Sequence, residues 1–348
     1  MQPMHPLSRR TFVRTAAGIV AFVPGLGAVL GQAPAPDIVT GSGEHRYRVQ
    51  HDWLTPPANI QWGDTHGLAQ DSQGRIYVSH TVHPASELKH AIVVFNRDGT
   101  FATSFGERFV GGGHGLDVRK EGDEEFLYHC DVHRRRVAKT KLDGTLVWEV
   151  GAPLEAKLGD SACYANEHEW SPTNVAFAPD GALFVGDGYG KSFVHRFSRD
   201  GEWRATLAGP GASKGEVNCP HGLWLDTRGA EPVLAVADRG NRRIQYFSLD
   251  GKHIRFVSDG MRQPCHFKTR GELMLVPDLS SVVTILDKDH KPVVHLCDGD
   301  PTNLRGVPRD QFIPGKFVHP HTAMWLDDGS ILVAEWVPIG RITRLVKI

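Results

Sequence analysis

Residues 219–251 read CPHGLWLDTRGAEPVLAVADRGNRRIQYFSLDG and contain most of one copy of a unit that recurs along the chain. The unit opens on a histidine, and alternating apolar runs follow, each ended by a turn rich in aspartate and glycine. A period of two between such turns is typical of β-strands. One copy carries threonine in place of the histidine. The units start at His66, His114, Thr173, His221, His266 and His321.

The repeat predicts an all-β fold, a six-bladed β-propeller. Units spaced roughly 40–60 residues apart fit blades of four antiparallel strands around one axis. The last unit ends one strand short at Ile348, and residues 44–49 have the alternating pattern of the missing strand. We therefore predict that an N-terminal strand closes the ring and that one propeller spans residues 36–348.

The N-terminal segment predicts export. Residues 8–14 (SRRTFVR) resemble a twin-arginine motif, residues 15–31 are apolar, and Ala33 and Ala35 suit cleavage. We expect residues 1–35 to be a twin-arginine-type signal peptide that engages the twin-arginine export machinery. The mature protein is then periplasmic or secreted, with no membrane attachment after signal cleavage. The alternative is a membrane anchor, which the glycines and the proline of this short stretch disfavour.

Composition indicates which classes of binding partner to expect. The net charge is −1, and no basic run extends beyond residues 134–136, so we expect a small-molecule substrate and no nucleic acid. Five cysteines leave at least one unpaired in a monomer. Cys219 and Cys265 stand just before ring histidines of neighbouring units. They could form a disulfide or, alternatively, supply soft metal ligands.

The repeated histidines predict a metal. In a propeller the innermost strands run along the axis, so equivalent positions form a ring at one mouth. Taking alternate units selects His114, His221 and His321, evenly spaced around the axis with one coordination position left open. Three imidazoles and an open position are what a catalytic zinc needs. Because neutral nitrogens accept several ions, we predict a divalent metal, zinc first and iron second.

Two further ring histidines, His66 and His266, belong to the predicted site with their role left open. They are outer hydrogen-bond donors, substrate contacts or ligands of a less regular site. The alternative for the ring is that main-chain groups satisfy each histidine. Packing alone would not repeat a titratable side chain at five of six equivalent positions, which argues against this alternative. We interpret His195, on an outer strand, as solvated.

Three stretches carry a family pattern: Asp187-Gly188-Tyr189, residues 219–223 (CPHGL) and residues 236–245 (VADRGNRRIQ). Together they resemble the NHL-repeat propeller of peptidyl-alpha-hydroxyglycine alpha-amidating lyase. The resemblance covers most of the chain from about residue 63 to the C-terminus. NHL repeats alone have low specificity, because many are binding scaffolds, and the histidine register together with the tyrosine is more specific.

The resemblance implies a zinc held by three histidines, which match His114, His221 and His321. It also places the family's catalytic tyrosine at Tyr189, acting as a base on the substrate hydroxyl beside a metal that polarises it. The alternative for Tyr189 is an aromatic side chain packed at a turn. The family reaction breaks a carbinolamide C–N bond and releases a peptide amide and glyoxylate.

The chain departs from the family in ways that affect the substrate and a second metal. The family's active-site arginine in the first blade matches Thr81, and its acidic residue after the third zinc ligand matches Thr322. That carboxylate helps hold a structural calcium beside a carbonyl equivalent to that of Leu116, so calcium is left open. Gly190 stands where the family has a disulfide cysteine. With no arginine identified to clamp a carboxylate, the sequence does not favour a glycine-derived substrate.

We therefore predict an exported, metal-dependent lyase that breaks a C–N or C–O bond in a hydroxylated small molecule, with Tyr189 as acid/base and His66 and His266 in the site. One alternative is a non-catalytic NHL-repeat scaffold that binds a protein or a glycan. Another is a propeller hydrolase of the lactonase type. That type expects Glu, Asp and Asn around the axis, whereas imidazoles suit zinc, iron or copper better than calcium.

Overall fold

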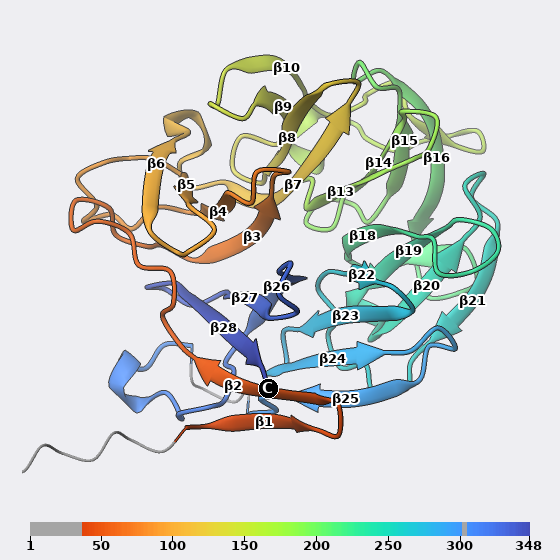
Figure 1. The fold of residues 1–348 in the computed structure, drawn as a ribbon. Helices are drawn as coiled ribbons and strands as arrows, with labels where there is room; N and C mark the ends of the chain where they lie inside the picture. The colour runs from red at the N-terminus through yellow and green to blue at the C-terminus, as the bar shows by residue number, and fades with distance from the viewer. Residues whose placement is uncertain (1–36, 301–304) are drawn as a thin grey trace, which may run out of the picture. The chain divides into compact units, whose positions relative to one another are not determined.

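The computed structural model describes residues 37–300 and 305–348, which lie in one compact unit, Asp37–Ile348. The predicted signal peptide at residues 1–35 lies outside the described residues, so the boundary at residue 36 stays a prediction. The described chain is all-β, and six sheets stand as blades around one axis (Figure 1). Among the described residues no helix has the length and apolarity needed to cross a membrane.

The first three blades follow the chain, and in each blade the first strand lies nearest the axis (Figure 1). Blade 1 comprises β3 (Thr65–Gln70), β4 (Ile76–His80), β5 (Ile92–Phe95) and β6 (Phe101–Phe105). Blade 2 comprises β7 (Gly113–Glu121), β8 (Glu124–Asp131), β9 (Arg136–Lys141) and β10 (Leu146–Val150). Blade 3 comprises β13 (Asn174–Phe177), β14 (Leu183–Gly186), β15 (Val194–Phe197), β16 (Trp203–Pro210) and β17 (Glu216–Val217).

The remaining blades repeat this order, and short elements connect them. Blade 4 comprises β18 (Pro220–Asp226), β19 (Val233–Asp238), β20 (Arg243–Phe247) and β21 (His253–Val257). Blade 5 comprises β22 (Lys268–Arg270), β23 (Leu273–Asp278), β24 (Val282–Leu286) and β25 (Pro292–Leu296). The connecting elements are η1 (Glu107–Phe109), β11 (Lys157–Leu158), β12 (Ser161–Ala162), η2 (Glu167–Glu169), η3 (Arg239–Asn241) and η4 (Arg309–Gln311).

Blade 6 joins the two ends of the described chain, as predicted. It contains β26 (Pro320–Trp325), β27 (Ile331–Glu335) and β28 (Arg341–Lys347), and β2 (His45–Gln50) pairs antiparallel with β28. The six-bladed propeller closed by an N-terminal strand is therefore confirmed. A further strand that the sequence did not predict, β1 (Val39–Ser42), pairs with β2 and widens this blade to five strands.

Apolar side chains fill the spaces between neighbouring blades. Leu68 and Val78 of blade 1, for example, share a buried cluster with Met324 and Leu332 of blade 6. Removing such side chains from water contributes about 25 cal/mol per Å² of apolar surface. This packing holds the innermost strands in place, and it therefore fixes the positions of the side chains that line the axis.

Candidate metal centre

Local backbone irregularities place the histidines at the axis. His66, His114, His221 and His321 are each the second residue of an innermost strand, and the pairing register shifts at each of these positions. A bulge of this kind redirects a side chain relative to the regular alternation of a strand. The register shifts in blade 5 as well, where Pro264 pairs with Asp278 and Lys268 with Leu275, so Cys265 takes the position of the ring histidines and His266 follows it. The prediction that His266 shares the ring position is therefore wrong. All five side chains are buried, with between 1% and 5% of each residue exposed.

The glycine that follows His66, His114 and His221 is explained by close packing of the blades. A Cβ on Gly115 would lie 2.4 Å from the carbonyl oxygen of Thr173, and one on Gly222 would lie 2.2 Å from that of Cys265. Side chains do not tolerate such distances, so only glycine lets the neighbouring blade approach this closely. The His-Gly pair in the repeat therefore serves to bring the next blade's carbonyl beside the histidine ring.

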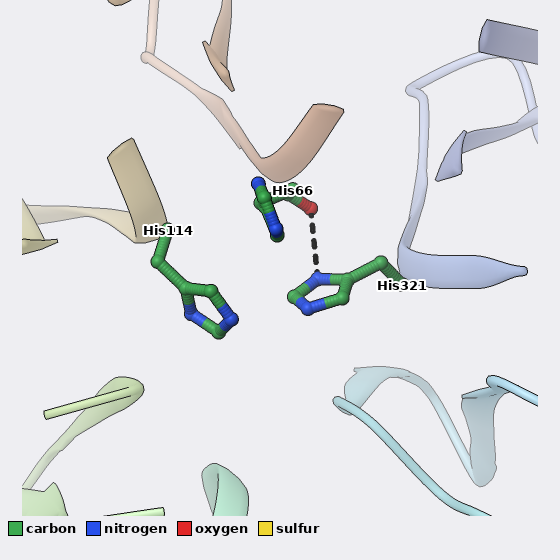
Figure 2. A group of neighbouring side chains, drawn as sticks. All are labelled: His66, His114 and His321. Atoms are coloured by element: carbon green, nitrogen blue, oxygen red, sulfur yellow. Dashed lines mark hydrogen bonds between the residues drawn. The ribbon is translucent and has the colours of Figure 1, made fainter. Parts of the chain in front are cut away.

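Four of the five histidines form one tight group. Ring centroids of His66, His114 and His321 lie 4.7 Å apart in each pair, and Figure 2 shows the three rings around a common point. Their ligand nitrogens all lie within 4.8 Å of one another. The His221 ring lies 4.9 Å from that of His114 and 4.7 Å from that of His321. The rings of the predicted triad are therefore in contact, but the three histidines whose ligand nitrogens meet at a metal-binding spacing in the described structure are His66, His114 and His321, and His221 is not among them.

Main-chain carbonyls set the tautomers of the predicted triad. The Nδ1 atoms of His114 and His221 lie 2.8 Å and 2.9 Å from the carbonyl oxygens of Thr173 and Cys265. The Nδ1 of His321 lies 3.3 Å from the carbonyl oxygen of His66 (Figure 2). A carbonyl only accepts, so each Nδ1 carries the proton and each Nε2 keeps its lone pair. Metal-bound histidines are oriented by outer partners of this kind.

The group is neutral and ready to donate lone pairs. Burial lowers the pKa of His114 to about 3, and it lowers the pKa values of His66, His221 and His321 well below the ordinary value. Neutral imidazole is the form that binds a metal. In the part of the chain that the structure describes, the buried Nε2 of His321 has no hydrogen-bond partner. The donor set and this unpartnered nitrogen both fit a divalent ion.

Tyr189 lies on one side of the group. Its hydroxyl is 3.3 Å from Nε2 of His114 and 3.1 Å from Nε2 of His221, while 44% of the residue remains exposed. Loss of water around the hydroxyl raises the pKa of Tyr189, and the nearby guanidinium of Arg239 opposes that rise. Asp187 holds the loop through backbone N–H groups of Ser171 and Lys191, each at 2.7 Å. Tyr189 is therefore positioned to reach both imidazoles.

Arg239 is a site residue that the sequence analysis missed. Its guanidinium lies 5.3 Å from the centre of the Tyr189 ring, and it contacts the thiols of Cys219 at 3.2 Å and Cys265 at 3.9 Å. Among the described residues no carboxylate forms an ion pair with it. The sequence identified no arginine for the site beyond the first-blade position that Thr81 occupies, and the structure places this one beside Tyr189. Its sequence signal was its place in VADRGNRRIQ, the stretch that carried the family resemblance.

Three other predictions concern the cysteines, His266 and His195. All five cysteines have free thiols, so the structure contains no disulfide between Cys219 and Cys265. His266 is buried, but within the described residues its ring contacts none of the other four. His195 is fully buried and bonded to Tyr164 at 2.8 Å, so the expectation that it is solvated is wrong. Its strand is covered by the loop before blade 3, which sequence periodicity could not reveal.

The structure gives little support to a calcium ion near the third ligand. Thr322 is buried there and offers a hydroxyl where calcium would use a carboxylate. Asp117, the residue after Leu116, is paired with the ammonium group of Lys268 at 2.8 Å. The donors present here do not fit a calcium ion.

Fold and site together define a class, a six-bladed β-propeller with a buried histidine group on its axis. No protein-family model matches the chain. It is 29% identical over 207 residues to a probable peptidyl-alpha-hydroxyglycine alpha-amidating lyase of Caenorhabditis elegans, covering 57% of this chain and 52% of the relative. It is 24% identical over 340 residues to lyase 1 of the same description from Drosophila melanogaster, covering 86% and 60%. Human NHL repeat-containing protein 3 is 28% identical over 214 residues, covering 59% and 57%.

The chain therefore resembles amidating lyases and NHL repeat proteins, and it spans only part of their length. It covers about a third (34%) of Xenopus laevis peptidyl-glycine alpha-amidating monooxygenase B, to which it is 26% identical over 324 residues. A streptogramin B lyase structure matches with a TM-score of 0.53 at 12% identity, covering 88% of this chain and 97% of that one. A putative gluconolactonase matches with 0.53 at 15%, covering 85% and 96%. At these identities the structures show the fold alone.

Proposed function

We propose that this protein is a metal-dependent lyase that breaks the C–N bond of a carbinolamide-type substrate, a carbon bearing both a hydroxyl and an amide nitrogen. The observation that carries the proposal is the Tyr189 hydroxyl, held within 3.3 Å of two neutral imidazoles of one buried group. A packed aromatic would not require this arrangement. The similarity to amidating lyases supports the same reaction class.

His114, His221 and His321 would hold the ion through their Nε2 atoms, with zinc as the first candidate and iron as the second. A bound divalent ion polarises a substrate hydroxyl and makes its proton easier to remove. The carbonyls that fix the three tautomers leave the Nε2 lone pairs free to bind, and His221 would have to move closer to join His114 and His321 around one ion. Burial of the group excludes water that would compete for the ion.

Tyr189 balances the protons of the reaction. Breaking the C–N bond converts the hydroxyl-bearing carbon to a carbonyl, so the hydroxyl loses a proton while the departing nitrogen gains one. Because the pKa of Tyr189 is raised, the side chain is protonated at neutral pH and can donate to the nitrogen. It then recovers the proton from the hydroxyl. Arg239, which lowers the same pKa, stabilises the phenolate between the two transfers.

Arg239 also bears on the substrate. The half-buried Arg239 guanidinium has thiols and an aromatic ring as neighbours, and among the described residues it lacks the anion that such groups normally face. A substrate carboxylate on the hydroxyl-bearing carbon would supply it. We therefore extend the proposal to N-acyl-α-hydroxyglycine compounds, which release glyoxylate and an amide. Other amides of α-hydroxy carboxylates fit the same chemistry.

Export belongs to the proposal as well. The twin-arginine-like motif at residues 8–14 supports a periplasmic or secreted enzyme delivered by the twin-arginine machinery. That route moves folded proteins, so an ion could be inserted before export. Fractionation of cells that make the full-length chain, compared with an Arg9→Lys/Arg10→Lys variant, tests this part. Equal amounts of extracytoplasmic protein in both strains would contradict it.

Metal analysis and turnover together test the proposed function. The purified mature protein should contain about one equivalent of zinc or iron, and a His114→Ala/His221→Ala variant should lose it. Glyoxylate release from an N-acyl-α-hydroxyglycine should fall by roughly 10²–10⁴-fold in Tyr189→Phe. A folded parent that takes up no metal after reloading would overturn the proposal and leave the scaffold alternative. The lactonase alternative is supported by fold alone, because the axis offers imidazoles where that type expects carboxylates.

A further inference from the structure

The triad of His114, His221 and His321 has three edges, and two of them have different neighbours. The Tyr189 hydroxyl bridges His114 and His221, at 3.3 Å and 3.1 Å from their Nε2 atoms. His66 spans His114 and His321, with its ring centre 4.7 Å from each (Figure 2). His221 and His321 contact each other directly. Tyr189 and His66 thus occupy different edges of the same triangle.

His66 is also the ring histidine that the proposed mechanism leaves without a task. It is 5% exposed, and its buried Nδ1 has no hydrogen-bond partner in the described structure. A buried polar nitrogen without a partner is costly and needs an explanation. Its ligand nitrogen lies within 4.8 Å of those of His114 and His321. Donors around one ion with metal–nitrogen distances of about 2.0–2.1 Å lie about 3–4 Å apart, so the rings would have to move only slightly inward to share an ion.

We propose that His66 is a fourth protein ligand, so that four imidazoles hold the ion. This rests on the proposed metal-dependent function and goes beyond a three-histidine site. Four ligands would close a tetrahedral zinc and leave no place for substrate. With His66 bound as a fourth ligand, an ion of five or six coordination such as iron would replace zinc as the first candidate. A substrate would approach the ion from the edge that Tyr189 occupies, which is not the edge that His66 spans.

The chain offers a matched control for this proposal. His266 is 4% exposed and also has an unpartnered buried Nδ1, but its ring does not contact the other four in the described residues. The pairing register of blade 5 gives the ring position to Cys265, and His266 follows it where His114 and His221 are followed by glycine. Loss of either histidine removes a buried imidazole. Only the loss of His66 should change the coordination of the ion.

Cobalt(II) is the probe, because its visible bands report coordination number and X-ray absorption counts bound imidazoles. The mature protein, freed of metal and titrated with cobalt, should bind one equivalent with four imidazoles and the weak bands of five or six coordination. His66→Ala should show three imidazoles. Its cobalt affinity should fall by more than the roughly 10–100-fold that loss of an outer hydrogen-bond partner costs. His266→Ala should keep the parent spectrum and count.

The outcomes separate this inference from the proposed function. One equivalent of cobalt with three imidazoles in the parent, unchanged in His66→Ala, overturns the fourth ligand and leaves the three-histidine site intact. No cobalt in a folded parent overturns both. If His66→Ala does not fold, His66→Gln fills the same space with an amide, and its imidazole count decides in the same way.

Discussion

A single buried histidine away from the axis should control part of the acid sensitivity of this protein. His129 is 2% exposed, bonds to the Thr140 hydroxyl through Nε2 at 2.8 Å and stacks on Phe109 at a centroid distance of 4.4 Å. Burial, with a smaller contribution from the charge of Arg108, lowers the pKa of His129 to about 3. In the unfolded chain the pKa returns to about 6.5.

The direction and size of the effect follow from these two values. Because the folded-state pKa is lowered, the unfolded chain takes up the proton first as the pH falls below about 6.5, and stability is lost toward pH 3. At pH 5, protonation of this one histidine in the unfolded chain lowers the free energy of unfolding by about 2 kcal/mol. At pH 7 the same effect is only about 0.2 kcal/mol. The figure at pH 5 is insensitive to the folded-state value, because His129 is neutral there in either case.

Urea unfolding of the metal-free parent and of His129→Gln at pH 7 and pH 5 measures this contribution. Glutamine keeps a group that can bond to Thr140 but cannot take up a proton. We compare the free energy of unfolding of the variant with that of the parent. This difference should be about 2 kcal/mol more favourable to the variant at pH 5 than at pH 7. The axial histidines are common to both proteins, so their protonation cancels in the comparison. The same free-energy difference at both pH values would refute the assignment of a neutral buried His129.

Three further measurements test the packing and the centre. Chelation should lower the thermal midpoint of the loaded protein, by the equivalent of about 2.7 kcal/mol for an ion present at 100 times its dissociation constant, and a midpoint indifferent to chelator would contradict a bound ion. Lys268→Met should cost about 3–5 kcal/mol in urea unfolding because it leaves the buried Asp117 unpaired, and adding Asp117→Asn should recover much of the loss. Leu345 lies in β28 and pairs with Val49 of the closing strand β2. Leu345→Ala should lower the free energy of unfolding by about 2–5 kcal/mol, and a loss under about 1 kcal/mol would argue that packing at the ring closure contributes little.

Much of the architecture was readable from local patterns. The period of two with Gly/Asp turns depends only on how successive side chains alternate on a strand, so it predicted the blades and the strand at residues 44–49. The repeated histidine predicted the axial ring, because equivalent positions in equivalent blades must meet around the axis. The sequence did not predict β1, because this short, exposed segment lacks an apolar face.

The composition of the site depended on the closed ring. His66 and His321 are 255 positions apart in the chain and touch only because blade 6 packs against blade 1. Arg239 reaches Tyr189 from the next blade, and no local pattern in either segment reports that contact. Burial of His195 likewise comes from a loop that covers its strand. A repeat specifies which side chains face the axis, whereas the distances between them follow from how the blades pack once the ring has closed.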